Sequence, residues 1–330
     1  MVERIVILGG GIAGISAKLR NKLGMLIDKN PYLTMSPRII DVISGKNQDY
    51  PLILRSLDYT GSVKSIDFEN RTVHLHDKDI TYDKVIIALG HSQNYSFIKG
   101  SRYITGFSGY RDALNLRNVI AQKKNIVIIG GGYLGVELAG TIGDSRVTIL
   151  EAGKQILAGL PSKFAETATD LLSISGVNLE LESPVIEVKK DAVIAEGKKY
   201  ISDLTIFAGG FTGNLPETMQ GITTNNSRIV VNSYLQSVDY KDVYAAGDSM
   251  FVENSGFIPM SAIIARSSGI IAMENSMGAE NIFKPNNFAN IIRVGKNYFG
   301  TVGNTFVHGI AAKIIKEGAI ALEVNRVKEL

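Results

Sequence analysis

The chain has 330 residues and a mass of 35.7 kDa, a length that suggests about two domains. It contains no cysteine, which excludes disulfides, thiolate metal sites, iron–sulfur clusters and a cysteine nucleophile. The net charge is only +3 and no long basic cluster is present, so nucleic acid is not an expected partner. Any redox chemistry must therefore belong to an organic cofactor.

Seven short runs rich in Val and Ile do not alternate with polar residues, which is typical of strands buried on both faces of a parallel sheet. The runs are Arg4–Leu8, Gly24–Ile27, Lys84–Ala88, Asn125–Ile129, Arg146–Leu150, Leu204–Ala208 and Asp242–Ala245. Helical patterns follow two of them directly, at Ile12–Lys22 and Tyr133–Ile142. The order predicts an α/β fold with two Rossmann-like, doubly wound parallel-sheet units.

Stretches with a period of two lie between these runs and predict antiparallel meanders inserted in each unit. They are Ser62–Asp67, Thr72–Leu75, Pro184–Val188 and Ala192–Ala195. Near the end, Ile310–Leu322 has helical spacing and reads as a domain cap, with an interfacial helix or a dimer face as alternatives. No uncharged apolar run of spanning length occurs, and a strand begins at about Arg4, so we expect neither a membrane span nor a signal peptide.

The first glycine motif is Gly9-x-Gly11-x-x-Gly14, placed between a strand and a helix. Such a turn lets the backbone and a helix N-terminus approach a pyrophosphate. Asp28 ends the next strand, near the ~20-residue distance at which these units place a ribose-binding acid. The motif therefore predicts a dinucleotide site, and the alternative is a glycine-rich turn without a ligand.

The second motif is Gly130-x-Gly132-x-x-Gly135, and Glu151 ends the strand after its helix. A carboxylate there would repel a 2′-phosphate, so NADH is predicted over NADPH, although Lys154 lies nearby. A nicotinamide needs a hydride acceptor, which a protein without cysteine lacks. A flavin in the other unit would supply it.

Three further motifs follow strands: Ala88-Leu89-Gly90, Ala208-Gly209-Gly210 and Gly247-Asp248. With them, residues 1–275 resemble the two-dinucleotide-binding flavoproteins, the pyridine-nucleotide-dependent flavin oxidoreductases. The resemblance implies that the first unit binds FAD, that the second binds NADH and is inserted in the first, and that Asp248 bonds the flavin ribityl chain. It also implies the division 1–105 and 229–284 for FAD, 106–228 for NADH, and 285–330 as a small C-terminal domain.

Within this superfamily the chain is most similar to type II NADH dehydrogenases and apoptosis-inducing-factor-like quinone reductases. Glu137 matches a glutamate that lies near nicotinamide and flavin in that group, and Met35-Ser36-Pro37 matches a segment whose proline lies against the isoalloxazine. The helix after Ser261 lacks the glutamines that line the quinone pocket there. Ile263, Ile264 and Ser267 would make that wall more apolar.

The predicted site residues follow from these motifs and this resemblance. Glu137 is the predicted catalytic residue, with an ordinary helix-capping acid as the alternative. The residues predicted to bind FAD are Gly9, Gly11, Ile12, Ala13, Gly14, Asp28, Lys29, Pro37, Ala88, Gly90, Gly247, Asp248, Ser261 and Ala262. Those predicted to bind NADH are Gly130, Gly132, Tyr133, Leu134, Gly135, Glu151, Gly209 and Gly210.

Other residue types give weaker signals. His74, His76 and His308 lack metal-ligand spacing, so no metal is predicted. His91 follows the Ala88-Leu89-Gly90 turn and either lies near FAD or is a solvated loop residue, and the solvated loop is favoured. Tyr298, Phe299 and Phe306 either line an acceptor pocket or belong to a core, and the core is favoured.

The sequence thus predicts an FAD-dependent oxidoreductase that moves hydride from NADH to flavin and electrons to an acceptor, with a quinone implied by the resemblance. The alternatives are a reductase of a small electron-transfer protein, or a flavin- and NADH-binding sensor or interaction protein of apoptosis-inducing-factor type. We expect a cytoplasmic protein, with peripheral contact at the inner face of the cell membrane and a homodimer as open alternatives.

Overall fold

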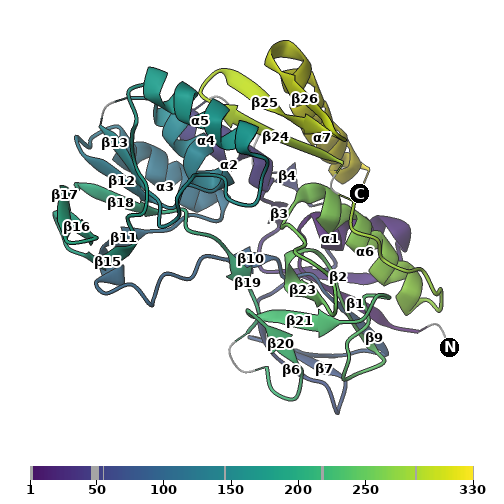
Figure 1. Cartoon of the computed structure of the whole chain (residues 1–330). Coiled ribbons are helices and arrows are strands. Elements are labelled where there is room, and N and C mark those ends of the chain that lie inside the picture. The colour runs from purple at the N-terminus through teal and green to yellow at the C-terminus, as the bar shows by residue number, and fades with distance from the viewer. Residues whose placement is uncertain are drawn as a thin grey trace.

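Two five-stranded parallel sheets form the centres of two units in the computed structural model (Figure 1). The structure describes residues 3–45, 52–54, 56–144, 146–216, 219–286 and 288–329. This arrangement confirms the predicted α/β class with two doubly wound units.

The first sheet has the strand order β22-β9-β1-β2-β5, and every neighbouring pair is parallel. Its strands are Val243–Ala245, Lys84–Ile87, Ile5–Leu8, Met25–Asp28 and Tyr59–Thr60, in that order. The strand β1 lies at the centre of the sheet and is buried on both faces. This burial explains why its apolar residues do not alternate with polar ones. The sheet combines strands from both halves of the chain.

The second sheet has the order β11-β18-β12-β13-β14 and is also parallel throughout. Its strands are Ile104–Thr105, Leu204–Phe207, Ile126–Ile129, Val147–Leu150 and Asn178–Glu180. The strand β11 pairs here, although the predicted boundary at residue 105 assigns it to the first domain. The four-part division of the chain otherwise stays a prediction.

Helices cover both sheets. They are α1 (Ile12–Arg20), α2 (Ile39–Ser44), α3 (Tyr110–Ile120), α4 (Tyr133–Ile142), α5 (Ser162–Ile174) and α6 (Ala262–Ser276). In the first unit α1 and α6 pack so closely that a Cβ on Gly269 would lie 2.1 Å from the Ala13 carbonyl oxygen. The contact requires glycine, because any side chain there would separate the two helices.

Small sheets complete each unit. Antiparallel meanders are formed by β6 (Val63–Asp67), β7 (Thr72–Leu75) and β8 (Asp79–Thr81), and by β15 (Val185–Val188), β16 (Ala192–Ala195) and β17 (Lys198–Ile201). The other short strands are β3 (Tyr32–Leu33) with β4 (Leu52–Ile53), β10 (His91–Ser92) with β19 (Thr212–Gly213), and β20 (Thr224–Asn225), β21 (Arg228–Val231) and β23 (Met250–Val252). The chain between the two units passes through β10 and β19, which pair antiparallel.

The C-terminal segment consists of an antiparallel sheet and a long helix (Figure 1). The strands are β24 (Ala289–Val294), β25 (Asn297–Val302) and β26 (Thr305–His308), and the helix α7 is Gly309–Lys328. Phe299 is 1% exposed and contacts Phe164 and Phe306, so these aromatic residues belong to a core. No helix among the described residues is long and apolar enough to cross a membrane.

The helix α7 extends beyond the predicted end at Leu322 and packs on β24, β25 and β26. Its inner face buries Ala312, Ile320 and Val327, while Ile310 and Leu322 on the outer face are 78% and 62% exposed. The inner face covers the sheet, as expected of a cap, and the outer face has apolar residues in solvent.

Candidate active site formed by two dinucleotide cradles

The first cradle lies where β1 meets α1. Gly9 has φ +107°, and a Cβ on it would lie 2.1 Å from the Ala88 carbonyl oxygen, while one on Gly14 would lie 1.8 Å from the Gly9 carbonyl oxygen. A Cβ on Gly11 would meet nothing within 4 Å, so the space above the N-terminus of α1 is open. Two glycines permit the tight turn and the third leaves room, which fits a pyrophosphate at the helix N-terminus.

Asp28 at the end of β2 closes this cradle. Its carboxylate accepts hydrogen bonds from the backbone N–H groups of Gly10, at 2.6 Å, and Asn30, at 2.7 Å. Burial raises the pKa of Asp28, although the two N–H donors and the Lys29 charge oppose this shift. The carboxylate is thus fixed beside the glycine turn, where its remaining lone pairs can accept ribose hydroxyls. Lys29 is exposed.

The second cradle repeats this geometry. A Cβ on Gly135 would lie 2.0 Å from the Gly130 carbonyl oxygen, and one on Gly132 would meet nothing within 4 Å. Glu151 accepts hydrogen bonds from the N–H groups of Gly131, at 2.6 Å, and Gly153, at 2.7 Å. The acid therefore holds the same place as Asp28 in the first unit, while Lys154 beside it is exposed.

The turns after β9 and β18 lie at the carboxyl edges of the two sheets. Gly90 has φ +75° and Gly210 has φ +117°, and neither would place a Cβ near another atom. Gly209 is packed closely, since a Cβ on Gly130 would lie 2.6 Å from its Cα. Ligands of open α/β sheets bind outside the carboxyl ends of the strands, so both turns are suitably placed for cofactors.

The turn Gly247–Ser249 brings the later half of the chain to the first cradle. Gly247 has φ +61° and its N–H donates to the Ser268 hydroxyl of α6 at 2.9 Å. Asp248 Oδ2 lies 2.7 Å from Nδ1 of His91, and the His91 ring packs against Phe211, with centroids 4.1 Å apart and planes tilted by 54°. His91 was expected in a solvated loop. This expectation is wrong, because the carboxylate and the ring hold a side chain that is only 16% exposed.

Arg228 on β21 lies near the same carboxylate. Burial lowers the pKa of its guanidinium, the Asp248 charge opposes that shift, and its Nε has no hydrogen-bond partner among the described residues. Asp248 is therefore flanked by a histidine and an arginine.

The helix α6 begins beside this turn. The Ser261 hydroxyl accepts a hydrogen bond from the Ile264 N–H at 3.4 Å, so Ser261 caps the helix. Ile264 is 1% exposed and packs in the core of the first unit. It therefore does not line a pocket wall, in contrast to the expectation, whereas Ile263 and Ser267 are partly exposed. The helical period turns Ile264 and Ser268 inward together.

Glu137 lies on α4 and faces the C-terminal segment. Its Oε1 accepts a hydrogen bond from the backbone N–H of Arg293 at 2.9 Å. The same oxygen forms an ion pair with Nζ of Lys316 on α7. The two side chains are 13% and 17% exposed. Glu137 therefore does not act as a cap of its own helix. Whether it is catalytic stays a prediction.

Tyr133 and Pro37 occupy the edges of this region. Tyr133, at the start of α4, donates to Asn290 Oδ1 at 3.3 Å, and burial together with the Glu137 charge raises its pKa to about 12. Pro37 lies in the short 3-10 turn Ser36–Arg38, just before α2. These positions place both residues where the two units and the C-terminal segment meet.

A network of charged residues joins α2 to the C-terminal segment, and no sequence motif indicated it. Asp41 binds Arg293 and also Arg38 at 2.9 Å, and Arg38 binds Glu317 at 2.7 Å. Burial opposes ionisation of Asp41, but the two arginines hold its pKa below the usual range. The one available signal was Asp41 within an otherwise apolar helix.

The fold and the two cradles define a class: an FAD- and NADH-binding oxidoreductase with two dinucleotide-binding units. Residues 3–269 match the family described as pyridine nucleotide-disulphide oxidoreductase, and the chain belongs to that family. The predicted superfamily and the predicted cofactors, FAD and NADH, are thereby confirmed.

Three known proteins illustrate the likeness. The demethylphylloquinone reductase of Synechocystis is 28% identical over 74% of this chain and 71% of its own length. The rubredoxin-NAD(+) reductase of Pseudomonas putida is 26% identical over 61% of this chain and 55% of its own length. The solved structure of NDH2 from Plasmodium falciparum with NADH has a TM-score of 0.82 at 15% identity and covers 99% of this chain and 98% of that one.

Proposed function

We propose that this chain is an NADH:quinone oxidoreductase, in which NADH reduces FAD and a quinone receives the electrons. The observation that carries the proposal is the path of α7. It binds α4 of the second unit through Lys316 and Glu137, and α6 of the first unit through Glu323 and Arg266, at 3.0 Å. The helix therefore bridges the two cofactor units. In the proposal the quinone binds beneath it.

The chain's own residues position the cofactors. Gly11, Asp28 and Asp248 would hold FAD, and Gly132 and Glu151 would hold NADH. FAD, when bound, accepts a hydride from NADH and passes two electrons on. If the flavin lies at the N-terminus of α6, the positive end of that helix would favour the negative charge of the reduced cofactor.

Quinone reduction also consumes protons, since NADH, one proton and a quinone give NAD⁺ and a quinol. The Glu137–Lys316 pair is well suited to supply one, because both side chains are largely buried and joined through Glu137 Oε1. We assign the pair to proton delivery to a quinone oxygen, followed by reprotonation from solvent. The partly exposed Ile263 on α6 provides an apolar contact for the quinone.

A second candidate is an NADH-dependent reductase of a small acidic electron-transfer protein, as the rubredoxin reductase relative suggests. The observation in its favour is a groove of 640 Å³ beside β15 that four cations line, with only two acids. The cations are Lys99, Arg102, Lys189 and Lys190, and the acids are Glu187 and Asp191. Such a surface attracts an acidic protein in a salt-dependent way.

Steady-state NADH oxidation with a soluble quinone, with rubredoxin and with oxygen tests the proposal. We expect quinone to be reduced fastest. Ile263→Trp should block quinone turnover but leave anaerobic flavin reduction by NADH intact, whereas the control Ile310→Trp on the outer face of α7 should change neither. A protein that reduces rubredoxin but no quinone would refute the proposal and favour the second candidate.

A further inference from the structure

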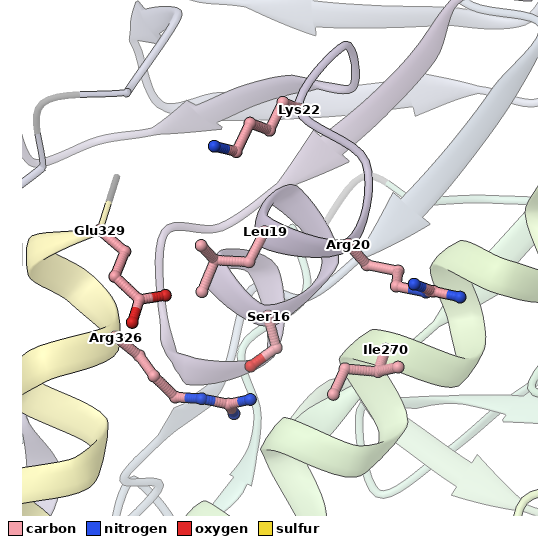
Figure 2. Close-up of a pocket in the computed structure, with 7 residues that line it drawn as sticks. All are labelled: Ser16, Leu19, Arg20, Lys22, Ile270, Arg326 and Glu329. Atoms are coloured by element: carbon pink, nitrogen blue, oxygen red, sulfur yellow. The ribbon is translucent and has the colours of Figure 1, made fainter.

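A cavity of 300 Å³ lies outside both cradles, between α1, α6 and the end of α7 (Figure 2). It is lined by Ser16, Leu19, Arg20, Lys22, Ile270, Arg326 and Glu329. These residues come from the C-terminal half of α1 and the turn after it, from the middle of α6 and from the last turn of α7. The cavity is therefore separate from the glycine turn at the start of α1.

Two polar groups in this cavity lack partners among the described residues. Arg326 Nη1 is buried and has no hydrogen-bond partner there. Ser16 is 4% exposed, and no hydrogen bond of its hydroxyl to another described residue is found. Figure 2 shows the Arg326 guanidinium extending from α7 toward Ser16 on α1. A buried, unpaired guanidinium nitrogen is costly, so it favours an acceptor in the cavity.

The charges around the cavity favour an anion. Arg20, Lys22 and Arg326 contribute three positive charges, and Glu329 on the rim contributes one negative charge. Glu274 neutralises part of Arg20 by binding its Nε at 2.6 Å. The net charge around the cavity is still positive. Glu329 limits how much negative charge a bound ligand can carry.

The cavity also has an apolar side, formed by Leu19 and Ile270. An oxyanion bound by the guanidinium fork and the serine hydroxyl would leave this side free for a small organic group attached to it. The volume is at the small end of the usual range for ligand sites, which excludes a second dinucleotide.

We propose that this cavity binds the phosphate group of a phosphate ester, held by Arg326 and Ser16 with Arg20 and Lys22 at the mouth. The ester is either a small soluble phosphate or the headgroup of an anionic phospholipid, since both present the same chemistry. Because residues of α7, α1 and α6 all line the cavity, a bound phosphate would link the C-terminal helix to the first unit.

Calorimetric titration of the FAD-saturated protein with glycerol 3-phosphate at constant ionic strength tests the proposal. We expect binding that Arg326→Gln weakens by about tenfold or more, because a hydrogen bond to a charged group is lost. Ser16→Ala should weaken it less. The control Lys328→Gln removes a positive charge from the same turn of α7 outside the cavity and should leave the affinity nearly unchanged.

Sedimentation with vesicles separates the two sources of phosphate. Binding to phosphatidylglycerol vesicles that Arg326→Gln abolishes and Lys328→Gln does not would identify a lipid headgroup, even if glycerol 3-phosphate binds weakly. Binding of the soluble ester alone would identify a small phosphate. The proposal is overturned if neither ligand binds, or if Lys328→Gln weakens binding as much as Arg326→Gln, which would indicate general electrostatic attraction only. Flavin content, measured in each variant, shows that the first cradle is intact.

Discussion

The two cradles have nearly the same local geometry but different surroundings. In each, an acid accepts a 2.6 Å hydrogen bond from the backbone N–H of the motif's second residue, Gly10 or Gly131, and the space beside the third residue is open. The first cradle is also enclosed by the Gly247–Ser249 turn and by α6, so Ala13 is only 5% exposed. In the second, Leu134 at the position that corresponds to Ala13 is only partly buried. The comparison suggests that the enclosed cradle retains its cofactor, while the open one exchanges it.

The largest expected effect comes from filling each open position in turn. Gly11→Val should give a folded but colourless protein, because a Cβ there meets no protein atom and the valine would occupy the space of the pyrophosphate. Gly132→Val should give a yellow protein whose KM for NADH rises roughly 100-fold. Absorbance spectra and stopped-flow flavin reduction measure both effects, and far-UV circular dichroism checks the fold. A Gly132→Val protein reduced by NADH at the normal rate would mean that NADH binds elsewhere.

The next effect concerns the charged residues that attach the C-terminal segment to the first unit. Asp41→Asn should lower the free energy of unfolding by about 3 kcal/mol, since it leaves the buried Arg293 charge without its carboxylate partner. The exposed pair of Asp79 with His74 provides the control, and Asp79→Asn should cost under ~1 kcal/mol. Urea unfolding measures both values.

This Asp41 effect should also depend on pH. The folded-state pKa of Asp41 is depressed, so its stabilisation is complete above the unfolded value near ~3.9 and is lost as pH falls through the folded value. The stability difference between the unmutated protein and Asp41→Asn should therefore be constant at neutral pH and shrink only in acid. A difference that shrank between neutral and alkaline pH would contradict the assignment.

A smaller effect should distinguish the two ribose-binding acids. Glu151→Ala should lower kcat/KM for NADH by about tenfold and kcat/KM for NADPH much less. The preference for NADH over NADPH should therefore become smaller. Asp28→Ala should lower flavin occupancy without changing the ratio of the two rates. Equal use of NADH and NADPH by the unmutated protein would show that Lys154 overrides the carboxylate.

The smallest effect is expected at His91. His91→Ala should weaken flavin binding by about 1 kcal/mol, since Asp248 loses one partner but keeps the nearby Arg228 charge. His74→Ala provides the control, because His74 binds an exposed aspartate in a meander. Flavin release during dialysis, followed by fluorescence, measures the difference.

The strands, both glycine turns and the cap at Ser261 could be predicted because each depends on local periodicity or on a few neighbouring residues. The burial of Ile264 and the partners of His91 could not. His91 and Asp248 are far apart in the chain, and only the packing of β10 against the Gly247–Ser249 turn brings them together. The Asp41–Arg293 and Glu137–Lys316 pairs were missed for the same reason, since single charged residues in apolar segments do not indicate their partners.

The strand order of the first sheet also affects the order in which the two units can be completed during synthesis. The second sheet draws all its strands from one continuous stretch, residues 104–207, and it is complete once that stretch has left the ribosome. The first sheet begins earlier but needs β22, and its flavin cradle needs α6, which ends at Ser276. Of the two units, the one whose synthesis begins first is therefore completed second, and FAD can be enclosed only after the whole second sheet has been made.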